Sequence, residues 1–175
     1  HVGLSSDETL LTVLIMLAVG FVGTFFFGRL VDAIGAKRVL FGGVVAGIVL
    51  AFPYFVMLDS GSLLVVVLAG TLLWLFTWST SAAAESIIVP ALFSTEHRGA
   101  GLTSAREMQG PIGGGLTPLI ATALVGVLGG APWLVAGYIV LSQLLTLSGF
   151  LLGRPKLTRV QIEATPAYRG LPADD

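Results

Sequence analysis

Residues 108–153 read MQGPIGGGLTPLIATALVGVLGGAPWLVAGYIVLSQLLTLSGFLLG, and not one of them is charged. A helix needs about 20 apolar residues to cross the hydrocarbon core of a bilayer, so this run is long enough for two crossings. The letters GGAP at 129–132 are typical of a turn and divide the run into two parts. The sequence therefore predicts two membrane-spanning helices in this stretch.

Upstream of this stretch the chain contains three more apolar runs of similar length, at 9–28, 39–58 and 63–84. A charged loop at 29–38, a turn at 58–62 and a more polar junction at 85–107 separate the runs. The last segment contains several prolines and ends with two aspartates, which is typical of a solvated, poorly ordered extension. We therefore expect an all-α transmembrane bundle of about five spanning helices in residues 1–153, followed by a tail at 154–175.

The composition supports a lipid environment and excludes several functions. Hydrophobic residues make up 55% of the chain and charged residues 11%, with a mean hydropathy of +0.94. Soluble domains carry roughly 25% charged residues. The chain has no cysteine, its two histidines lack metal-ligand spacing, and no catalytic motif stands in a loop. We therefore expect no enzyme activity, metal or cofactor, and the net charge of −1 gives no reason to expect nucleic acid.

The distribution of basic residues predicts the topology. All nine fall at alternate junctions: Arg29, Lys37, Arg38, Arg98, Arg106, Arg154, Lys156, Arg159 and Arg169. The opposite side carries only Asp7, Glu8 and Asp59. Because basic residues concentrate in cytoplasmic loops, we expect a protein of the cell (inner) membrane. The N-terminus of this chain should lie outside and its C-terminus in the cytoplasm.

Residues 28–38 form a motif that suits a contact at the membrane surface, reading GRLVDAIGAKR. Gly28 allows close approach of a neighbouring helix, and Gly35 permits a tight reversal. Asp32 is an anion suited to a helix N-terminus or an arginine. A plain basic hairpin with a solvated Asp32 is the alternative.

This loop resembles the signature Gly-x-Leu-x-Asp-Arg-x-Gly-Arg-Lys/Arg of the major facilitator superfamily. The matching residues are Gly28, Leu30, Asp32, Gly35, Lys37 and Arg38. Ala33 and Ala36 stand where the family has arginines. The resemblance implies that the loop acts as a gating latch between the two halves of a carrier.

Two further segments are similar to the metabolite:proton symporter family within that superfamily. Residues 90–101 read PALFSTEHRGAG and residues 113–124 read GGGLTPLIATAL. Ala91 and Ser94 depart from the family pattern, which has glutamate and proline there. The resemblance implies that the five spans are helices eight to twelve of a twelve-helix carrier, and that the N-terminal half of the same carrier is missing from this chain.

Three polar residues at the start of the fourth span are candidates for a substrate or proton pathway: Arg106, Glu107 and Gln109. Arg106 and Glu107 are adjacent, so they point about 100° apart on a helix and do not share a face. Charges inside a membrane mark substrate or proton paths, but both residues also fit the membrane interface, with Arg106 snorkelling. Glu85 is interpreted as a charge at the end of the third span.

Other features indicate packing. Small residues mark faces where helices approach closely in lipid: Gly42, Gly43, Gly47, Gly70, 79–84 and 113–115. Trp74 and Trp78 are interpreted mainly as packing or interface anchors, although either could face a cavity. Glycines and prolines break the fourth span, a pattern found at transporter binding sites and also in packing kinks.

Together these observations predict a secondary active transporter that works by alternating access. The resemblance implies proton-coupled symport of a small organic acid or a zwitterionic osmolyte. The expected partners are the lipid bilayer, a small-molecule substrate, a proton and the missing half of the carrier. A structural or channel-forming membrane subunit is the alternative.

Overall fold

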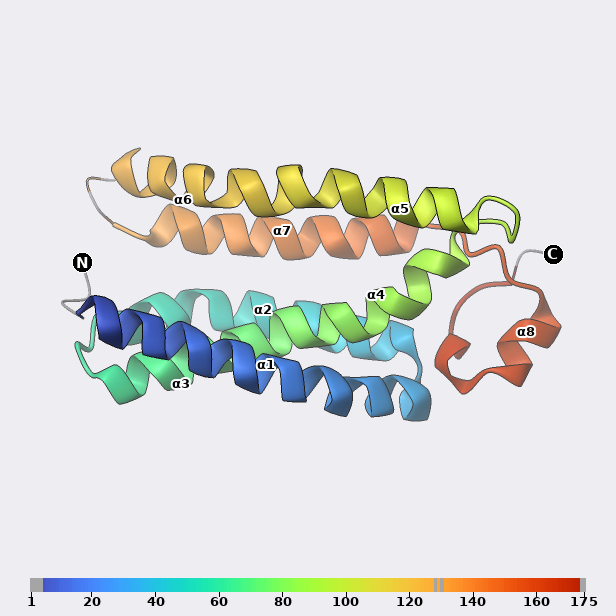
Figure 1. Cartoon of the computed structure of the whole chain (residues 1–175), viewed down its shortest axis with the longest axis horizontal. Helices are drawn as coiled ribbons and strands as arrows, with labels where there is room; N and C mark the ends of the chain where they lie inside the picture. Colours follow the sequence, from blue (N-terminus) through green and yellow to red (C-terminus); the bar gives the residue numbers. More distant parts are fainter. Residues whose placement is uncertain (1–4, 128, 130, 174–175) are drawn as a thin grey trace.

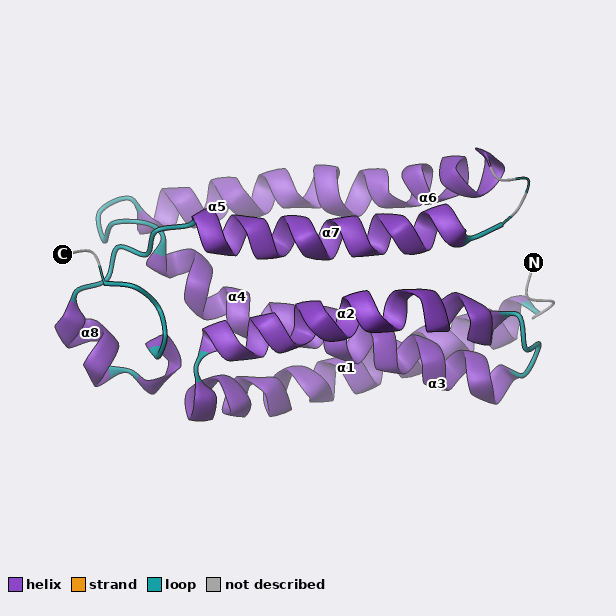
Figure 2. Ribbon diagram, turned by 180° about the vertical axis from the view of Figure 1, so that it is seen from behind, coloured by secondary structure: helices purple, strands orange, loops and turns teal. Residues whose placement is uncertain are grey.

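The computed structural model describes residues 5–127, 129 and 131–173, and it is a bundle of long helices (Figures 1 and 2). Five helices are long and apolar enough to cross a membrane: Ser6–Ile34, Ala36–Leu58, Leu63–Ala91, Arg98–Val127 and Trp133–Leu152. No strand occurs among the described residues. The predicted number and order of the spans are confirmed, and the chain is a multi-pass membrane protein.

The first two spans, α1 (Ser6–Ile34) and α2 (Ala36–Leu58), are joined by a single residue. The charged loop expected at 29–38 is therefore wrong, because α1 continues to Ile34 and α2 begins at Ala36. Gly35 makes the reversal with a φ of 93°, a region that side chains strongly disfavour. A hairpin this tight needs a glycine, which explains Gly35 without any loop.

The third and fourth spans are longer than the sequence predicts. The third consists of α3 (Leu63–Trp74), a π-helical segment (Leu75–Ser79) and α4 (Thr80–Ala91). The fourth consists of α5 (Arg98–Gln109), a second π-helical segment (Gly110–Gly115) and α6 (Leu116–Val127). The polar junction expected at 85–107 therefore shrinks to residues 92–97. Polar side chains on a helix do not end it. The predicted helix ends were wrong because the charges of Glu85 and Arg106 were interpreted as lying outside the spans.

The helices form one tightly packed group, to which the fourth span (α5 and α6) is loosely attached. α2 lies at the centre and contacts α1, α3, α4 and α7 (Trp133–Leu152). α6 packs along α7 (Figure 1). Among the other helices of the described residues, α5 contacts α4 and its own continuation. In the most apolar window of each span, 39% of the residues of α2 are buried and none of the fourth span. The fourth span therefore leaves most of its surface open.

Small residues make the close contacts of the tight group. A Cβ atom at Gly43 would collide with Thr80 and lie 2.9 Å from the carbonyl oxygen of Phe76. The hydroxyl of Ser79 is buried and donates a hydrogen bond of 2.9 Å to the carbonyl oxygen of Gly20, which joins the third span to α1. By contrast, nothing lies within 4 Å of a Cβ placed at Gly42. The predicted packing faces are therefore confirmed at Gly43 but not at Gly42.

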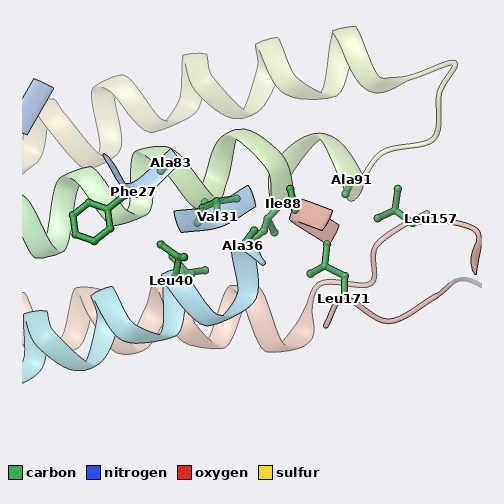
Figure 3. Close-up of a cluster of buried hydrophobic side chains, with 12 residues drawn as sticks. Phe27, Val31, Ala36, Leu40, Ala83, Ile88, Ala91, Leu157 and Leu171 are labelled. Atoms are coloured by element: carbon green, nitrogen blue, oxygen red, sulfur yellow. The ribbon is translucent and has the colours of Figure 1, made fainter. Parts of the chain in front are cut away.

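The C-terminal segment 154–173 is folded, which corrects the expectation of a poorly ordered extension. It contains α8 (Arg159–Ala164) and a short 3₁₀ turn (Pro166–Tyr168). Leu157, Ala167 and Leu171 are buried in a cluster with side chains from α1, α2 and α4 (Figure 3). Apolar residues scattered among prolines hid this core from the sequence analysis, because they follow no helical or strand period.

Candidate functional site: a polar cleft between the third and fourth spans

A cleft of about 710 Å³ opens between the third span and α5. Its walls come from the π-helical segment Leu75–Ser79 and α4 on one side and from α5 on the other. Its charged and amide-bearing residues are Glu85, Arg106, Gln109 and Gln143. Such groups are expensive in a bilayer, so an open space lined by four of them is a candidate site.

On the α5 wall, helical spacing selects which candidates face the cleft. Arg106 and Gln109 both line it, because residues three apart share one face of a helix. Glu107 does not line it, although it is exposed. Arg106 stands about 12 Å along α5 from Arg98, where the helix begins. The structure therefore brings two of the three sequence candidates together and separates the third from them.

Across the cleft, α4 supplies a carboxylate. Glu85 is half-buried and lies more than one helical turn before Ala91, where α4 ends. Arg106 and Glu85 thus line the same cleft with opposite charges, and the two side chains form no ion pair in the structure. The interpretation of Glu85 as a charge at the end of the span is therefore wrong. Its spacing of four residues from Ser81, another lining residue, is the signal that could have shown it.

Two tryptophans form an aromatic surface in the same cleft. Trp74 and Trp78 stack with ring centroids 5.2 Å apart and an interplanar angle of 17°. Both line the cleft, and Trp78 is 53% exposed. Flat, accessible aromatic rings are suited to contact a planar or cationic part of a solute. Of the two interpretations that the sequence left open for these tryptophans, the structure supports the one in which they face a cavity.

The π-helical segment of the third span lines the cleft, and such segments are frequent at functional sites. The π-helical segment of the fourth span begins just after Gln109 and does not line it. In the third span, hydroxyls bond to carbonyls of the preceding turn. Thr77 donates to the carbonyl oxygen of Leu73 at 2.6 Å, and Thr80 to that of Phe76 at 2.5 Å. These bonds turn the two hydroxyls back onto their own helix, and Thr77 also lines the cleft.

α2 does not line the cleft, but its Gly47 supports two residues that do. A Cβ at Gly47 would lie 2.8 Å from Thr77 and 2.9 Å from the amide of Gln143. Glycine at this position therefore lets Thr77 of the third span and Gln143 of α7 approach α2 together. Gln143 lines the cleft, so this contact fixes the position of one of its amides.

The motif residues of the first hairpin lie elsewhere. Asp32, Lys37 and Arg38 are exposed on either side of Gly35, and none of the six motif residues lines the cleft. Lys37 places its Nζ atom 5.9 Å from the ring centroid of Phe150 in α7. Among the described residues, no side chain donates a hydrogen bond to the Asp32 carboxylate. The motif is thus a separate, surface-facing site.

Neither site offers metal-binding chemistry in the part of the chain that the structure describes, since no three His, Cys, Asp or Glu side chains converge there. The groups that line the cleft are a guanidinium for an anion, a carboxylate for a cation or proton, two amides for hydrogen bonds, and an aromatic surface.

Comparisons with known proteins identify the family. The family model described as Major Facilitator Superfamily matches residues 1–172. The Shikimate transporter of Escherichia coli (strain K12) is 28% identical over 119 residues, covering 65% of this chain and 27% of that protein. The chain thus matches about a quarter of the length of that relative. No solved structure matches the chain significantly. With its five spans and a family match over nearly its whole length, the chain belongs to the major facilitator superfamily.

Proposed function

We propose that this chain is part of a secondary active transporter that moves a small solute across a membrane by alternating access. The observation that carries the proposal is the polar cleft of Glu85, Arg106, Gln109 and Gln143 inside an otherwise apolar bundle. Charged groups held at membrane depth cost free energy, so they persist where they serve a solute or ion path. Membership of the superfamily supports the same conclusion.

The lining of the cleft fits a small organic acid or a zwitterion. The Arg106 guanidinium offers paired N–H donors to a carboxylate, a strong, charge-assisted interaction. Glu85 and the Trp74–Trp78 surface suit a hydroxylated, planar or cationic remainder of the solute. The related Escherichia coli protein is named for shikimate, a cyclic carboxylic acid, which agrees with this chemistry.

Proton coupling is the finer part of the proposal. Glu85 stands across the cleft from Arg106 and can alternate between a protonated and an ionised form as the solute binds and leaves. A carboxylate that loses its solvent favours its neutral form, whereas a nearby cation favours its charged form. Arrival of a solute carboxylate at Arg106 would weaken the second effect, and so link solute binding to proton uptake.

The alternating movement would involve the loosely attached fourth span. Among the helices of the described chain, it contacts α7 through α6 and α4 through α5, and it contains a π-helical segment. A helix with few buried contacts can shift at low cost, and discontinuous helices are common at transporter binding sites. In the complete carrier we expect the N-terminal half to close the cleft from the other side. We also expect the carrier to lie in the cell (inner) membrane, with the C-terminus of this chain in the cytoplasm.

The proposal is tested with the complete carrier in proteoliposomes. Counterflow of radiolabelled solute and solute-evoked proton flux are measured over a panel of dicarboxylates, cyclic acids, proline and betaine. We expect saturable uptake, counterflow and external alkalinisation with one chemical class. Non-saturating flux without counterflow would indicate the channel alternative instead. Counterflow without a pH change would leave the carrier assignment standing and remove proton symport.

A further inference from the structure

We propose that residues 154–173, hereafter the strap, clamp the ends of α1 and α4 together, so that the hairpin carrying Asp32 moves as one unit with the third span. The strap lies at the end of the bundle that holds the α1–α2 turn and the 92–97 junction (Figure 1). This role goes beyond the polar cleft, because no strap residue lines it.

The first contact of the strap is with the end of α1. The last four carbonyl groups of a helix have no partner within the helix, and a cation is favoured near them. α1 has no basic residue in its own last turn. Instead, a guanidinium nitrogen of Arg169 donates a hydrogen bond of 3.3 Å to the carbonyl oxygen of Ala33. The strap therefore supplies the cation that the last turn of α1 lacks.

The same residue fits against the hairpin turn. A Cβ built on Gly35 would lie 2.6 Å from the carbonyl oxygen of Arg169 and 3.1 Å from its Cβ. Only a glycine at the turn leaves room for the strap backbone. Gly35 thus meets two requirements, because it adopts the positive φ of the turn and leaves space for the strap backbone. This contact lies next to Asp32 in the last turn of α1.

The second contact is with the end of α4. The backbone N–H of Lys156 donates a hydrogen bond of 2.6 Å to the carbonyl oxygen of Ala91, the last residue of that helix. The strap therefore pairs end carbonyls of two separate helices, α1 and α4. These helices belong to different hairpins of the bundle.

An apolar core holds the strap in place. Leu157, Ala167 and Leu171 are 1%, 3% and 6% exposed, in one cluster with residues such as Val31 and Ile88 (Figure 3). By contrast, Val160 in α8 is 74% exposed. Burial of this kind is the main force that holds a short segment against a helix bundle. A charge at a buried strap position should release it, whereas the same charge at Val160 should not.

The strap is tested with single-cysteine reporters, because this chain has no cysteine and any cysteine elsewhere in the carrier is first replaced by serine. In the complete carrier, Ala167→Cys is combined with Leu171→Asp or with Val160→Asp as the matched control. We expect a hydrophilic maleimide to label the reporter slowly alone and in the control, and at least about 10-fold faster with Leu171→Asp. Equal labelling rates in all three proteins would show that the strap is not seated.

The clamp is tested by hydrogen exchange, which does not depend on the proposed function. With Leu171→Asp, peptides covering the end of α1 and the end of α4 should both exchange faster. Arg169→Ala should give the milder effect at the end of α1 only. Faster exchange confined to 154–173 would contradict the clamp, even with transport intact.

The transport consequence rests on the proposed function. If the strap couples the hairpin to the third span, its release should lower the maximal transport rate by about 2- to 30-fold and leave the KM for solute unchanged. An unchanged rate after proven release would overturn the coupling. A parent protein that moves no solute would refute the proposed function and leave the exchange test decisive for the clamp.

Discussion

Arg106 and Glu107 are neighbours in the sequence, yet only Arg106 lines the cleft. The sequence predicts that the two cannot share a helix face, and the structure adds which of them faces Glu85. That choice depends on how α5 is rotated against the rest of the bundle. Rotation is set by tertiary contacts, which no local pattern encodes for a span with so little buried surface.

The neighbouring pair allows a matched test at the residue scale. We expect Arg106→Gln to raise the KM for an anionic solute by about 10- to 100-fold, because a hydrogen-bonded charge contributes about 1.5–3 kcal/mol. Glu107→Gln, one position further, should change the KM less than about twofold. Initial uptake rates over a range of solute concentrations measure both values. Equal effects of the two substitutions would remove Arg106 from the binding site.

Asp32 offers a second test at this scale. Its carboxylate lies in the last turn of α1, where the helix dipole disfavours an anion, and it has no hydrogen-bond donor among the described residues. It therefore suits a cationic or helix-terminal partner in the other half of the carrier. We expect Asp32→Asn to leave membrane insertion intact and to slow turnover about 5- to 150-fold, the usual size of coupling between sites. Equal turnover of the variant and the unchanged carrier at matched protein levels would contradict the assignment of the 28–38 motif as a gating latch.

At the scale of the helices, apolar length predicted the five spans and their order, while their ends were the weak point. Runs of about 20 apolar residues identify a span directly. Glu85 and Arg106 concealed the continuation of their helices, because charge was interpreted as an end of the span. The π-helical segments could not be predicted either. They arise from how the third and fourth spans pack and bond, rather than from a residue type.

Gly42 and Gly43 provide a matched pair for helix packing. Gly43→Ala should lower stability by about 1–3 kcal/mol, because the backbone oxygen of Phe76 and the side chain of Thr80 leave no space for a methyl group. Gly42→Ala meets nothing within 4 Å and should raise stability by up to about 1 kcal/mol, as alanine does in a helix. Thermal unfolding of the purified protein in detergent measures both. A loss of stability in the Gly42 variant would contradict this packing.

At the scale of the whole molecule, the alternation of charge agrees with the arrangement of the helix ends. The α1–α2 turn, the 92–97 junction and the strap lie at one end of the bundle, and the α2–α3 turn lies at the other (Figure 1). The strap itself was missed because its burial depends on surfaces contributed by three helices far apart in the sequence. Composition alone made it resemble a solvated tail.

The orientation in the membrane can be tested with single cysteines at exposed turns. Ser60→Cys in the α2–α3 turn should react with an impermeant maleimide added to intact cells. Ser94→Cys in the 92–97 junction should react only after the cells are permeabilised, because we propose from the basic residues on its side that this side is cytoplasmic. The reversed pattern would invert the proposed topology.

The single-residue link at Gly35 constrains how the gene can vary. A residue inserted there and taken into α2 would rotate the rest of that helix by about 100° and shift it by about 1.5 Å. Gly43 and Gly47 would then turn away from the helices that they touch. The 92–97 junction is a six-residue connection, so a change in its length need not rotate the helices on either side. Among natural carriers of this kind, insertions and deletions should therefore be common at that junction and rare in the first hairpin.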